Sequence, residues 1–580
     1  METPQLDSAL AKLRAALAGI RLPLESPSAL AAADYARRQV VQLDDYILPR
    51  LAEQNAPLLA VVGGSTGAGK STLVNSLVRR VVSPSSVLRP TTRTPILVHN
   101  PADRHWFDSE RILPGLRRGG DEDGVGALSL AEDLTLPAGL ALLDAPDIDS
   151  VVAENRQLAT QLLDAADLWI FLTTAVRYAD AVPWEYLRQA ADRNALVAVV
   201  LDRVPAIATR EVSGYLADML RQRGLGSSKL FCVPETELDE NGLLPQAMVS
   251  ELTRWLAELA QDSAARRRAV AQTLGGAVQA MSRNVPKVVQ ALREQEAELV
   301  GLREMASRAY REANARIAEQ TTNGTMLRGE VLARWHDFVG TGQFFRAVEQ
   351  KIGSLRDRIT AFFSGTSKHA AETGAAIRAG LEILIRQEAE AAAGRVHDAW
   401  EADPAGRGVV VGASWDIGHG SPSLAGAVGD LVRAWEADVL QLVGEAEVPK
   451  RVQPRYQALG VSGVSASLMV FVFAQTGGLI DVAADAADRV AVGTAALAGR
   501  ALDAIFGPQE VRRLALSAKN NLDYRISELL NTEEYRYGKL LDELGVDPAI
   551  AVELAGALAE TEFARQGDSR LGGDLMGEVR

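Results

Sequence analysis

Residues Gly64 to Ser71 read GSTGAGKS, which is a complete phosphate-binding loop motif. In this motif the lysine reaches the β- and γ-phosphates of a bound nucleotide, and the hydroxyl residue after it ligates Mg²⁺. These roles fall to Lys70 and Ser71. The residues predicted to bind nucleotide in this loop are Gly64, Ser65, Thr66, Gly67, Ala68, Gly69, Lys70, Ser71 and Thr72.

The residues around the loop match what the motif requires. An apolar run over 58–62 comes before the loop and the segment TLVNSLV, over 72–78, follows it, which predicts a buried strand, the loop and then a helix. A helix that begins here directs its first N–H groups and the positive end of its dipole at the β-phosphate. A chance glycine-rich turn is a weak alternative, because the motif, the strand before it and the helix after it all agree.

A GTPase also needs a threonine from a second loop to complete the Mg²⁺ coordination and to sense the γ-phosphate. The segment RPTTRTP, over 89–95, precedes an apolar run and offers Thr92 for this role, with Thr91 as the neighbouring alternative. An ordinary polar turn would also explain the segment.

The run LLDAPD, over 142–147, predicts the second switch, with Asp144 at a strand end where a carboxylate holds a Mg²⁺-bound water. Asp147 stands where the DxxG pattern has glycine, so its carboxylate would lie near phosphate charge. The next residue is Ile148, not a glutamine that could orient the attacking water. The predicted metal ligands are Ser71, Thr92 and Asp144, and the predicted catalytic residues are Lys70, Thr92 and Asp144.

Guanine is usually selected by an NKxD-like tetrad whose last carboxylate accepts hydrogen bonds from the base. After the apolar run 196–201 this chain has Asp202, Arg203, Val204 and Pro205. Arg203 can stack on a base as the usual lysine does, but Pro205 has no carboxylate. Asp202 is the candidate substitute, and a turn carboxylate would explain it equally well, so selectivity for GTP over ATP stays open.

Composition narrows the class of protein. The chain has 580 residues and a formal charge of −14, which argues against nucleic acid as a partner because phosphate binding needs a basic face. Its one cysteine, Cys232, excludes a disulfide framework within the chain. The N-terminal residues METPQLDSALAKL lack a basic region followed by an apolar core, so we expect no secretory signal and a site that faces the cytosol.

Short apolar runs alternate with helical stretches after the loop, which predicts an α/β P-loop domain with a mostly parallel sheet and helices on both faces. Long amphipathic patterns dominate the rest and predict an all-α neck and trunk, with Pro286 as a break or kink. The predicted segments are N-terminal helices over 1–53, the α/β domain over 54–245, a helical trunk over 246–455 with a loop over 404–423, an apolar hairpin over 456–507, a returning helix over 508–565 and a flexible tail over 566–580.

The hairpin begins with 25 residues, 456–480, that contain no charged side chain. Three interpretations compete: a hairpin that enters lipid, which we favour, a tip that enters only the membrane interface, and a helix pair buried in the protein. The predicted membrane-contact residues are Leu468, Met469, Val470, Phe471, Val472 and Phe473.

With RPTTRTP, DAPDIDS, the flanking helices and the distant hairpin taken together, the chain resembles the bacterial dynamin-like proteins. The runs YADAVPWEYL, over 178–187, and FAQTGGL, over 473–479, are similar to those of an actinobacterial branch of that family. The resemblance implies a GTPase with bound Mg²⁺ that self-associates, or pairs with a related dynamin-like protein, on the cytoplasmic side of a membrane. Dynamins carry Gln and Ser inside the loop for water and cation positioning, whereas Thr66 and Gly67 stand here.

Three functions follow as hypotheses. The first is a nucleotide hydrolase that binds, tethers or remodels the cytoplasmic membrane. The second is a cytosolic regulatory GTPase on a large assembly, which leaves the apolar hairpin unexplained. The third is a scaffold that binds nucleotide with little turnover, which Asp147 and Pro205 favour.

Overall fold

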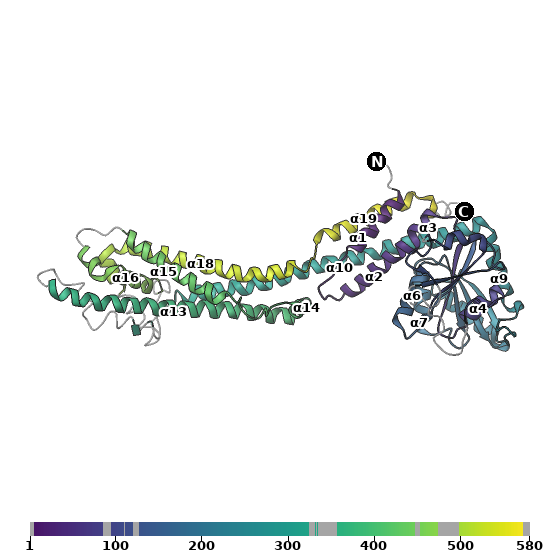
Figure 1. Cartoon of the computed structure of the whole chain (residues 1–580), viewed down its shortest axis with the longest axis horizontal. Coiled ribbons are helices and arrows are strands. Elements are labelled where there is room, and N and C mark those ends of the chain that lie inside the picture. The colour runs from purple at the N-terminus through teal and green to yellow at the C-terminus, as the bar shows by residue number, and fades with distance from the viewer. Residues whose placement is uncertain are drawn as a thin grey trace. The chain divides into compact units, whose positions relative to one another are not determined.

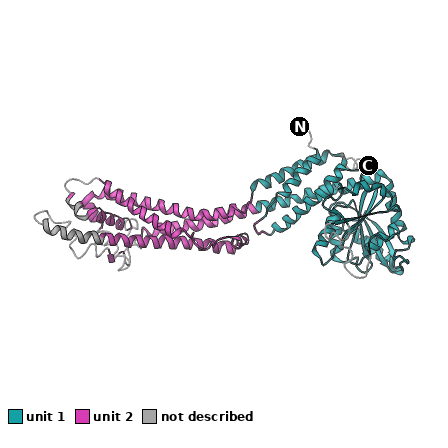
Figure 2. Cartoon of the chain, viewed as in Figure 1, with its two compact units in different colours: residues 1–22, 27–294, 547–580 teal, residues 23–26, 295–546 magenta. Residues whose placement is uncertain are grey.

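The computed structural model describes residues 5–84, 94–109, 111–119, 127–323, 331, 333–334, 356–446, 453–473 and 498–571. The chain forms two compact units (Figure 2). Unit 1 consists of residues 1–22, 27–294 and 547–580, and unit 2 of residues 23–26 and 295–546. Thr91, Thr92 and residues 474–497 of the predicted hairpin lie outside the described residues.

Unit 1 contains a β-sheet with helices packed around it (Figure 1). Among the described residues the sheet has eight strands, in the order β3-β4-β2-β5-β1-β6-β7-β8. Five neighbouring strands from β5 to β8 are parallel, and β3, β4 and β2 are parallel to one another but meet β5 antiparallel. The mostly parallel sheet is therefore confirmed. The strands are β1 Leu58–Gly64, β2 Ile96–His99, β3 Arg117–Arg118, β4 Ala127–Glu132, β5 Leu140–Asp144, β6 Leu168–Thr174, β7 Leu196–Val204 and β8 Lys229–Pro234.

Successive residues of β1 enter different apolar clusters because side chains alternate across a strand. Leu58, Ala60 and Val62 join one cluster, and Leu59 and Val61 join the other. The first cluster includes residues of α4 Lys70–Val78, α9 Gln246–Gln261 and the start of α10 Ser263–Gln320. The second includes α6 Ala153–Asp164, α7 Ala181–Asp192, α8 Thr209–Gln222 and more of α10. Helices thus cover both faces.

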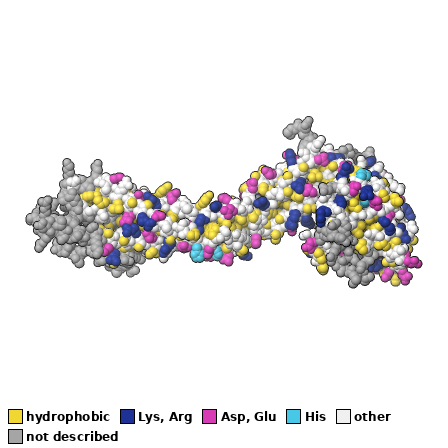
Figure 3. Space-filling model, in the orientation of Figure 1, with side chains coloured by type: hydrophobic (Ala, Val, Ile, Leu, Met, Phe, Trp, Pro, Cys, Tyr) yellow, Lys and Arg dark blue, Asp and Glu magenta, His cyan; other side chains and the backbone are white. Residues whose placement is uncertain are grey.

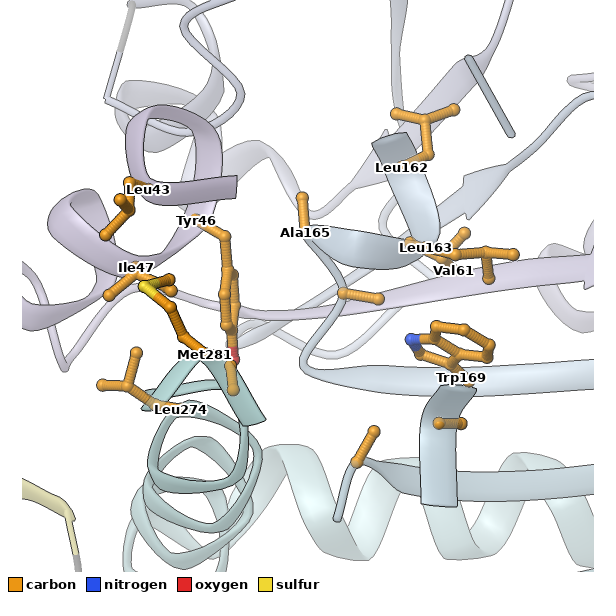
Figure 4. Packing of buried hydrophobic residues seen from close by; sticks show 14 of the residues in the cluster. Leu43, Tyr46, Ile47, Val61, Leu162, Leu163, Ala165, Trp169, Leu274 and Met281 are labelled. Atoms are coloured by element: carbon orange, nitrogen blue, oxygen red, sulfur yellow. The ribbon is translucent and has the colours of Figure 1, made fainter. Parts of the chain in front are cut away.

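Helices from both ends of the chain belong to unit 1. They are α1 Leu6–Ala18, α2 Ala29–Gln42, the π-helix Leu43–Ile47, α3 Leu48–Ala52 and, from the C-terminal end, α19 Pro548–Gly567. Tyr46 and Ile47 lie beside Met281 of α10 (Figure 4), and all three belong to the apolar cluster that contains Trp169 of β6. The N-terminal helices are therefore part of the core of unit 1. The helices α1 and α19 lie side by side, and Arg570 after α19 binds Asp7 of α1 with Nη2 3.0 Å from Oδ2.

Unit 2 is all helical among its described residues. Its helices are the end of α10, α13 Arg356–Ala402, α14 Pro404–Gly412, α15 Leu424–Glu445, α16 Gln453–Val472 and α18 Pro508–Asp542. On the face of the molecule in Figure 3, acidic and basic side chains are interspersed over both units.

Several expectations differ from the structure. α10 continues through Pro286, and Pro404 begins a helix because Asp403 caps it by accepting from the N–H groups of Ala405 and Gly406. Residues 246–261 pack on the sheet as α9, so they belong to unit 1. The part of the tail that the structure describes, to residue 571, is held in place, because Arg570 is bonded to Asp7 and Asp568.

The six residues predicted to contact a membrane are packed inside unit 2. Leu468, Met469, Val470, Val472 and Phe473 are buried and Phe471 is partly buried. Phe473 packs on Trp435 with ring centroids 5.7 Å apart, and Gly499 leaves room for Phe471, because a Cβ there would lie 2.9 Å from its Cε2. Among the described residues, no helix is both long and apolar enough to cross a bilayer.

Candidate nucleotide-binding site

The phosphate-binding loop lies at a topological switch point of the sheet. β1 pairs with β5 on one side and β6 on the other, and β7 follows β6. The segments after these four parallel strands therefore meet at one edge. In open α/β sheets ligands bind in this crevice at the carboxyl ends of the strands.

Glycine is required at three positions of the loop for reasons that the geometry makes specific. A Cβ at Gly64 would lie 2.3 Å from the backbone oxygen of Leu172 on β6, so a side chain cannot fit there. Gly67 and Gly69 have φ values of 73° and 101°, which side chains disfavour. Gly69 is the residue before α4, so the loop leads directly into the helix N-terminus, whose free N–H groups favour an anion.

Lys70, the first residue of α4, turns its side chain back into the loop. Its Nζ donates to the carbonyl oxygens of Gly64 at 3.0 Å and Ser65 at 3.2 Å and forms an ion pair with Asp147. The Lys70 side chain is only 6% exposed. The Lys70 ammonium thus lies within the loop, where the sequence predicts a phosphate-binding cation.

Asp144 at the end of β5 is fully buried and accepts hydrogen bonds at Oδ2 from the hydroxyls of Ser71 and Ser83, each at 2.6 Å. Burial raises the pKa of Asp144, and the two hydroxyls offset this only in part. In the described part of the chain its Oδ1 has no hydrogen-bond partner. The sequence assigns Ser71 and Asp144 to one metal site, and the structure brings the two side chains together; nothing in the sequence pointed to Ser83.

The residues present fit Mg²⁺. A serine hydroxyl and a carboxylate with one buried oxygen unpaired offer hard oxygen ligands, which Mg²⁺ prefers, and substrate phosphates usually complete such a site. No three His, Cys, Asp or Glu side chains gather for a metal among the residues that the structure describes. The third predicted ligand, Thr92, lies outside those residues.

Two charged residues near Thr66 were not predicted. Asp149 accepts from the Thr66 N–H at 2.6 Å and from its hydroxyl at 2.7 Å. Arg177, after β6, donates to Asp149 Oδ2 at 2.9 Å and to the Thr66 carbonyl at 3.0 Å. Burial acts to raise the pKa of Asp149, but the bonds from Thr66 and Arg177 outweigh it, and the pKa is held below its ordinary value. The three segments are distant in sequence, so no local pattern pointed to this cluster.

The segment after β7 approaches the loop from the other side. Arg203 has φ 53°, and its Nη2 donates to the carbonyl oxygen of Gly67 at 2.6 Å. Asp202 is largely buried and its pKa is raised by that burial, with Nε of Arg203 3.2 Å from its Oδ2. Pro205 is exposed. The structure therefore brings Asp202 and Arg203 to the loop as predicted and provides no carboxylate at 205.

No family model matches the chain, and no curated protein sequence matches it. Among solved structures it is similar to a chain from an oligomerised bacterial dynamin pair, described as a mechanism for long-range sensing and tethering of membranes. That match has 11% identity and a TM-score of 0.42, and it covers 100% of this chain and 96% of the other.

A second similar structure is LeoA, a bacterial dynamin GTPase from ETEC, with 12% identity, a TM-score of 0.23 and coverage of 96% of this chain and 97% of that one. A third is Era from Aquifex aeolicus bound to GDP and aluminium fluoride. It has 20% identity and a TM-score of 0.23, and the match covers 35% of this chain and 56% of Era. At these identities, residue roles rest on the geometry of the chain itself.

Proposed function

We propose that this chain hydrolyses a nucleoside triphosphate, with GTP favoured, at the loop between β1 and α4. The observation that carries the proposal is that a group able to bind phosphate and a pair of groups able to bind Mg²⁺ lie in the same crevice. The buried ammonium of Lys70 lies inside the loop, and Ser71 Oγ lies 2.6 Å from Asp144. A cation for the phosphates and oxygen ligands for Mg²⁺ therefore lie next to each other, as phosphoryl transfer requires.

Each residue would contribute positioning or charge. Lys70 would neutralise the β- and γ-phosphates, and the first N–H groups of α4 would bind the β-phosphate. Ser71 and Asp144 would hold Mg²⁺, directly and through water, and Mg²⁺ supplies the neutralisation of phosphate charge. Thr92 is proposed as the threonine of the second loop. Ile148 is buried and cannot orient water, so we expect slow basal turnover.

The test is GTP turnover and nucleotide binding by the whole chain and by Lys70→Ala. Loss of the charge on the phosphates should abolish detectable turnover and weaken binding about 100-fold, a few kcal/mol. Lys287→Ala, an exposed change on α10, is the matched control and should leave both unchanged. Equal binding by the Lys70 variant and the parent would contradict the assigned site.

We also propose self-association through the edge of the sheet that carries the site. Val151 after β5, Val176 after β6 and Ile207 after β7 are 94%, 90% and 100% exposed. Large apolar side chains in three segments at the same edge of the sheet favour a contact surface. Specific activity should rise with protein concentration, and Ile207→Asp should remove the rise, whereas Val552→Asp, on α19 and 73% exposed, should not.

Peripheral association with the cytoplasmic membrane is proposed for the segment 456–507. Its support is the charge-free run 456–480 in the sequence. Because the described side chains of 468–473 are buried or partly buried, lipid contact through them would require the helices of unit 2 to separate. Flotation with liposomes, with and without a GTP analogue, tests this. Absence of flotation under both conditions would leave the cytosolic regulator as the better hypothesis.

A second candidate function is a nucleotide-binding scaffold with little turnover. The ion pair of Asp147 with Lys70 favours it, because it places a carboxylate where the second switch usually has glycine. Tight binding of GTP with no phosphate release at any protein concentration, or on membranes, would support the scaffold over the hydrolase.

A further inference from the structure

Three loop groups that would hold the triphosphate and Mg²⁺ are each bonded to a carboxylate of the segment 144–149. The Lys70 ammonium is paired with Asp147, the Thr66 N–H with Asp149, and the Ser71 hydroxyl with Asp144. Asp144 belongs to the proposed metal site. The other two carboxylates have no role in that site, and they lie where anions are expected.

The hydrogen bonds of Lys70 are complete in this arrangement. An ammonium has three N–H donors, and those of Lys70 are directed at Gly64 O, Ser65 O and Asp147 Oδ1. With 6% of the side chain exposed, water contributes little to its solvation. Asp147 therefore supplies the counter-charge that a phosphate would otherwise supply.

The position of Asp147 is fixed by its neighbour. Ile148 is fully buried, and its N–H lies 3.4 Å from the carbonyl oxygen of Gly64, so the segment is anchored beside the loop. Asp147 and Asp149 flank this anchor, one on Lys70 and one on Thr66. A glycine at 147, as in the usual pattern, would have no side chain to reach Lys70.

We propose that Asp147 is an internal competitor of the nucleotide, taking the place of a phosphate on Lys70, and that Asp149 does the same at the Thr66 N–H. The proposal rests on the proposed nucleotide binding at this loop. Two anions cannot share one buried ammonium without strong mutual repulsion, so the nucleotide must displace Asp147 before it binds. The free site is thereby held closed, and its affinity is set by how easily the segment withdraws.

The test compares Asp147→Asn with the parent chain. The amide keeps the shape of the side chain and removes its charge. Dissociation constants of labelled GDP and of a non-hydrolysable GTP analogue should both fall about tenfold, since one ion pair no longer has to break. The melting temperature of the nucleotide-free protein should fall at the same time, because Lys70 loses its counter-charge. A merely structural role would not produce tighter binding together with lower stability.

Asp218→Asn is the matched control, because it makes the same charge change at an exposed position of α8 and should alter neither measurement. Asp147→Gly, which restores the usual residue, is the second variant and should also bind both nucleotides more tightly. If the asparagine variant does not fold, this glycine variant decides the question.

Two outcomes would overturn the proposal. The first is a parent chain that binds nucleotide while neither Asp147 variant binds more tightly. The second is a gain confined to the GTP analogue, which would mean that Asp147 repels the γ-phosphate in the bound state and does not occupy Lys70 in the free state. Failure of the proposed function looks different: neither the parent nor any variant would bind nucleotide.

Discussion

Arg50 of α3 and Asp167, which precedes β6, form an ion pair in the interior of unit 1, with side chains 6% and 0% exposed. Nε of Arg50 lies 2.9 Å from Asp167 Oδ1, and the Leu59 N–H of β1 donates to Oδ2 at 2.8 Å. The Asp167 carbonyl accepts from Thr273 of α10 at 3.0 Å. One aspartate thus joins the N-terminal helices, the sheet and α10.

This pair predicts a large stability effect from a single substitution. Arg50→Ala should destabilise unit 1 by about 3–5 kcal/mol, because it leaves a buried carboxylate without its partner. Arg37→Ala breaks an exposed pair with Asp34 and should cost less than about 1 kcal/mol. The urea midpoints of the two variants are compared. Similar midpoints would show that the buried pair contributes no more to stability than the exposed pair.

The contribution of Ser71 to GTP affinity should depend on Mg²⁺, because its proposed role is to ligate the metal. We expect EDTA to weaken GTP binding by the parent chain, and Ser71→Ala to lose about tenfold in affinity when Mg²⁺ is present but little when it is absent. Titration of labelled GTP at several Mg²⁺ concentrations measures this. Ser250→Ala, on α9 and bonded to the Ala247 carbonyl at an exposed position, is the control. An equal loss with and without Mg²⁺ would argue against metal binding by Ser71.

Discrimination between GTP and ATP should be weak, and a single substitution at Pro205 should increase it. Because Pro205 offers no acceptor for the guanine N–H groups, competition between GTP and ATP should show less than ~10⁴-fold discrimination. Pro205 is exposed, so Pro205→Asp should be tolerated and should increase the preference for GTP. Strong discrimination by the parent would show that Asp202 or another group selects the base.

The Asp149 cluster predicts a pH-dependent contribution to stability. Its folded-state pKa is depressed, so its contribution is present above the pKa of the unfolded chain, roughly 3.9, and is lost as pH falls through the folded-state value. Asp149→Asn should therefore cost about 1–3 kcal/mol near neutral pH, and the difference from the parent should shrink in acid. Urea midpoints of the nucleotide-free protein at several pH values test this; a constant difference would contradict it.

Charged substitutions within the run 468–473 should lower the stability of unit 2, because the run is packed inside it. Val470 and Val472 are 0% and 2% exposed, so Val470→Glu with Val472→Glu buries two carboxylates and should unfold unit 2. Val461→Glu, at a residue 40% exposed, should melt close to the parent. Thermal melting and liposome flotation are measured together. Lost flotation with an intact melt would instead favour lipid contact by the hairpin.

The loop could be predicted from the sequence because its function depends on residues that are adjacent in the chain. Lys70 and Ser71 need only the strand before them and the helix after them. The cluster of Thr66, Asp149 and Arg177 could not be predicted, because it joins the segments after three different strands and exists only once β1 lies between β5 and β6.

The hairpin shows a different limit. Apolar content does not separate lipid from protein interior as the partner of a helix, since both exclude water. The run Leu468 to Phe473 could pack equally well in lipid or in protein. The residues that it contacts, Trp435 and Gly499, are far from it in the sequence, so the run itself does not reveal them. The antiparallel pairing of β2 with β5 could not be predicted either, because no residue pattern within one strand shows the direction of its neighbour.

The side-by-side packing of α1 and α19 has a consequence for the order of folding during synthesis. The ribosome makes the buried leucines of α1 long before it makes Leu554 of α19 and Arg570; these leucines are Leu6, Leu10, Leu13 and Leu17. At about 5–20 residues per second, on the order of a minute separates them on the ribosome. An apolar helix that waits this long without its partner is a natural client for a chaperone, and synthesis of α19 is the step that completes this helix pair.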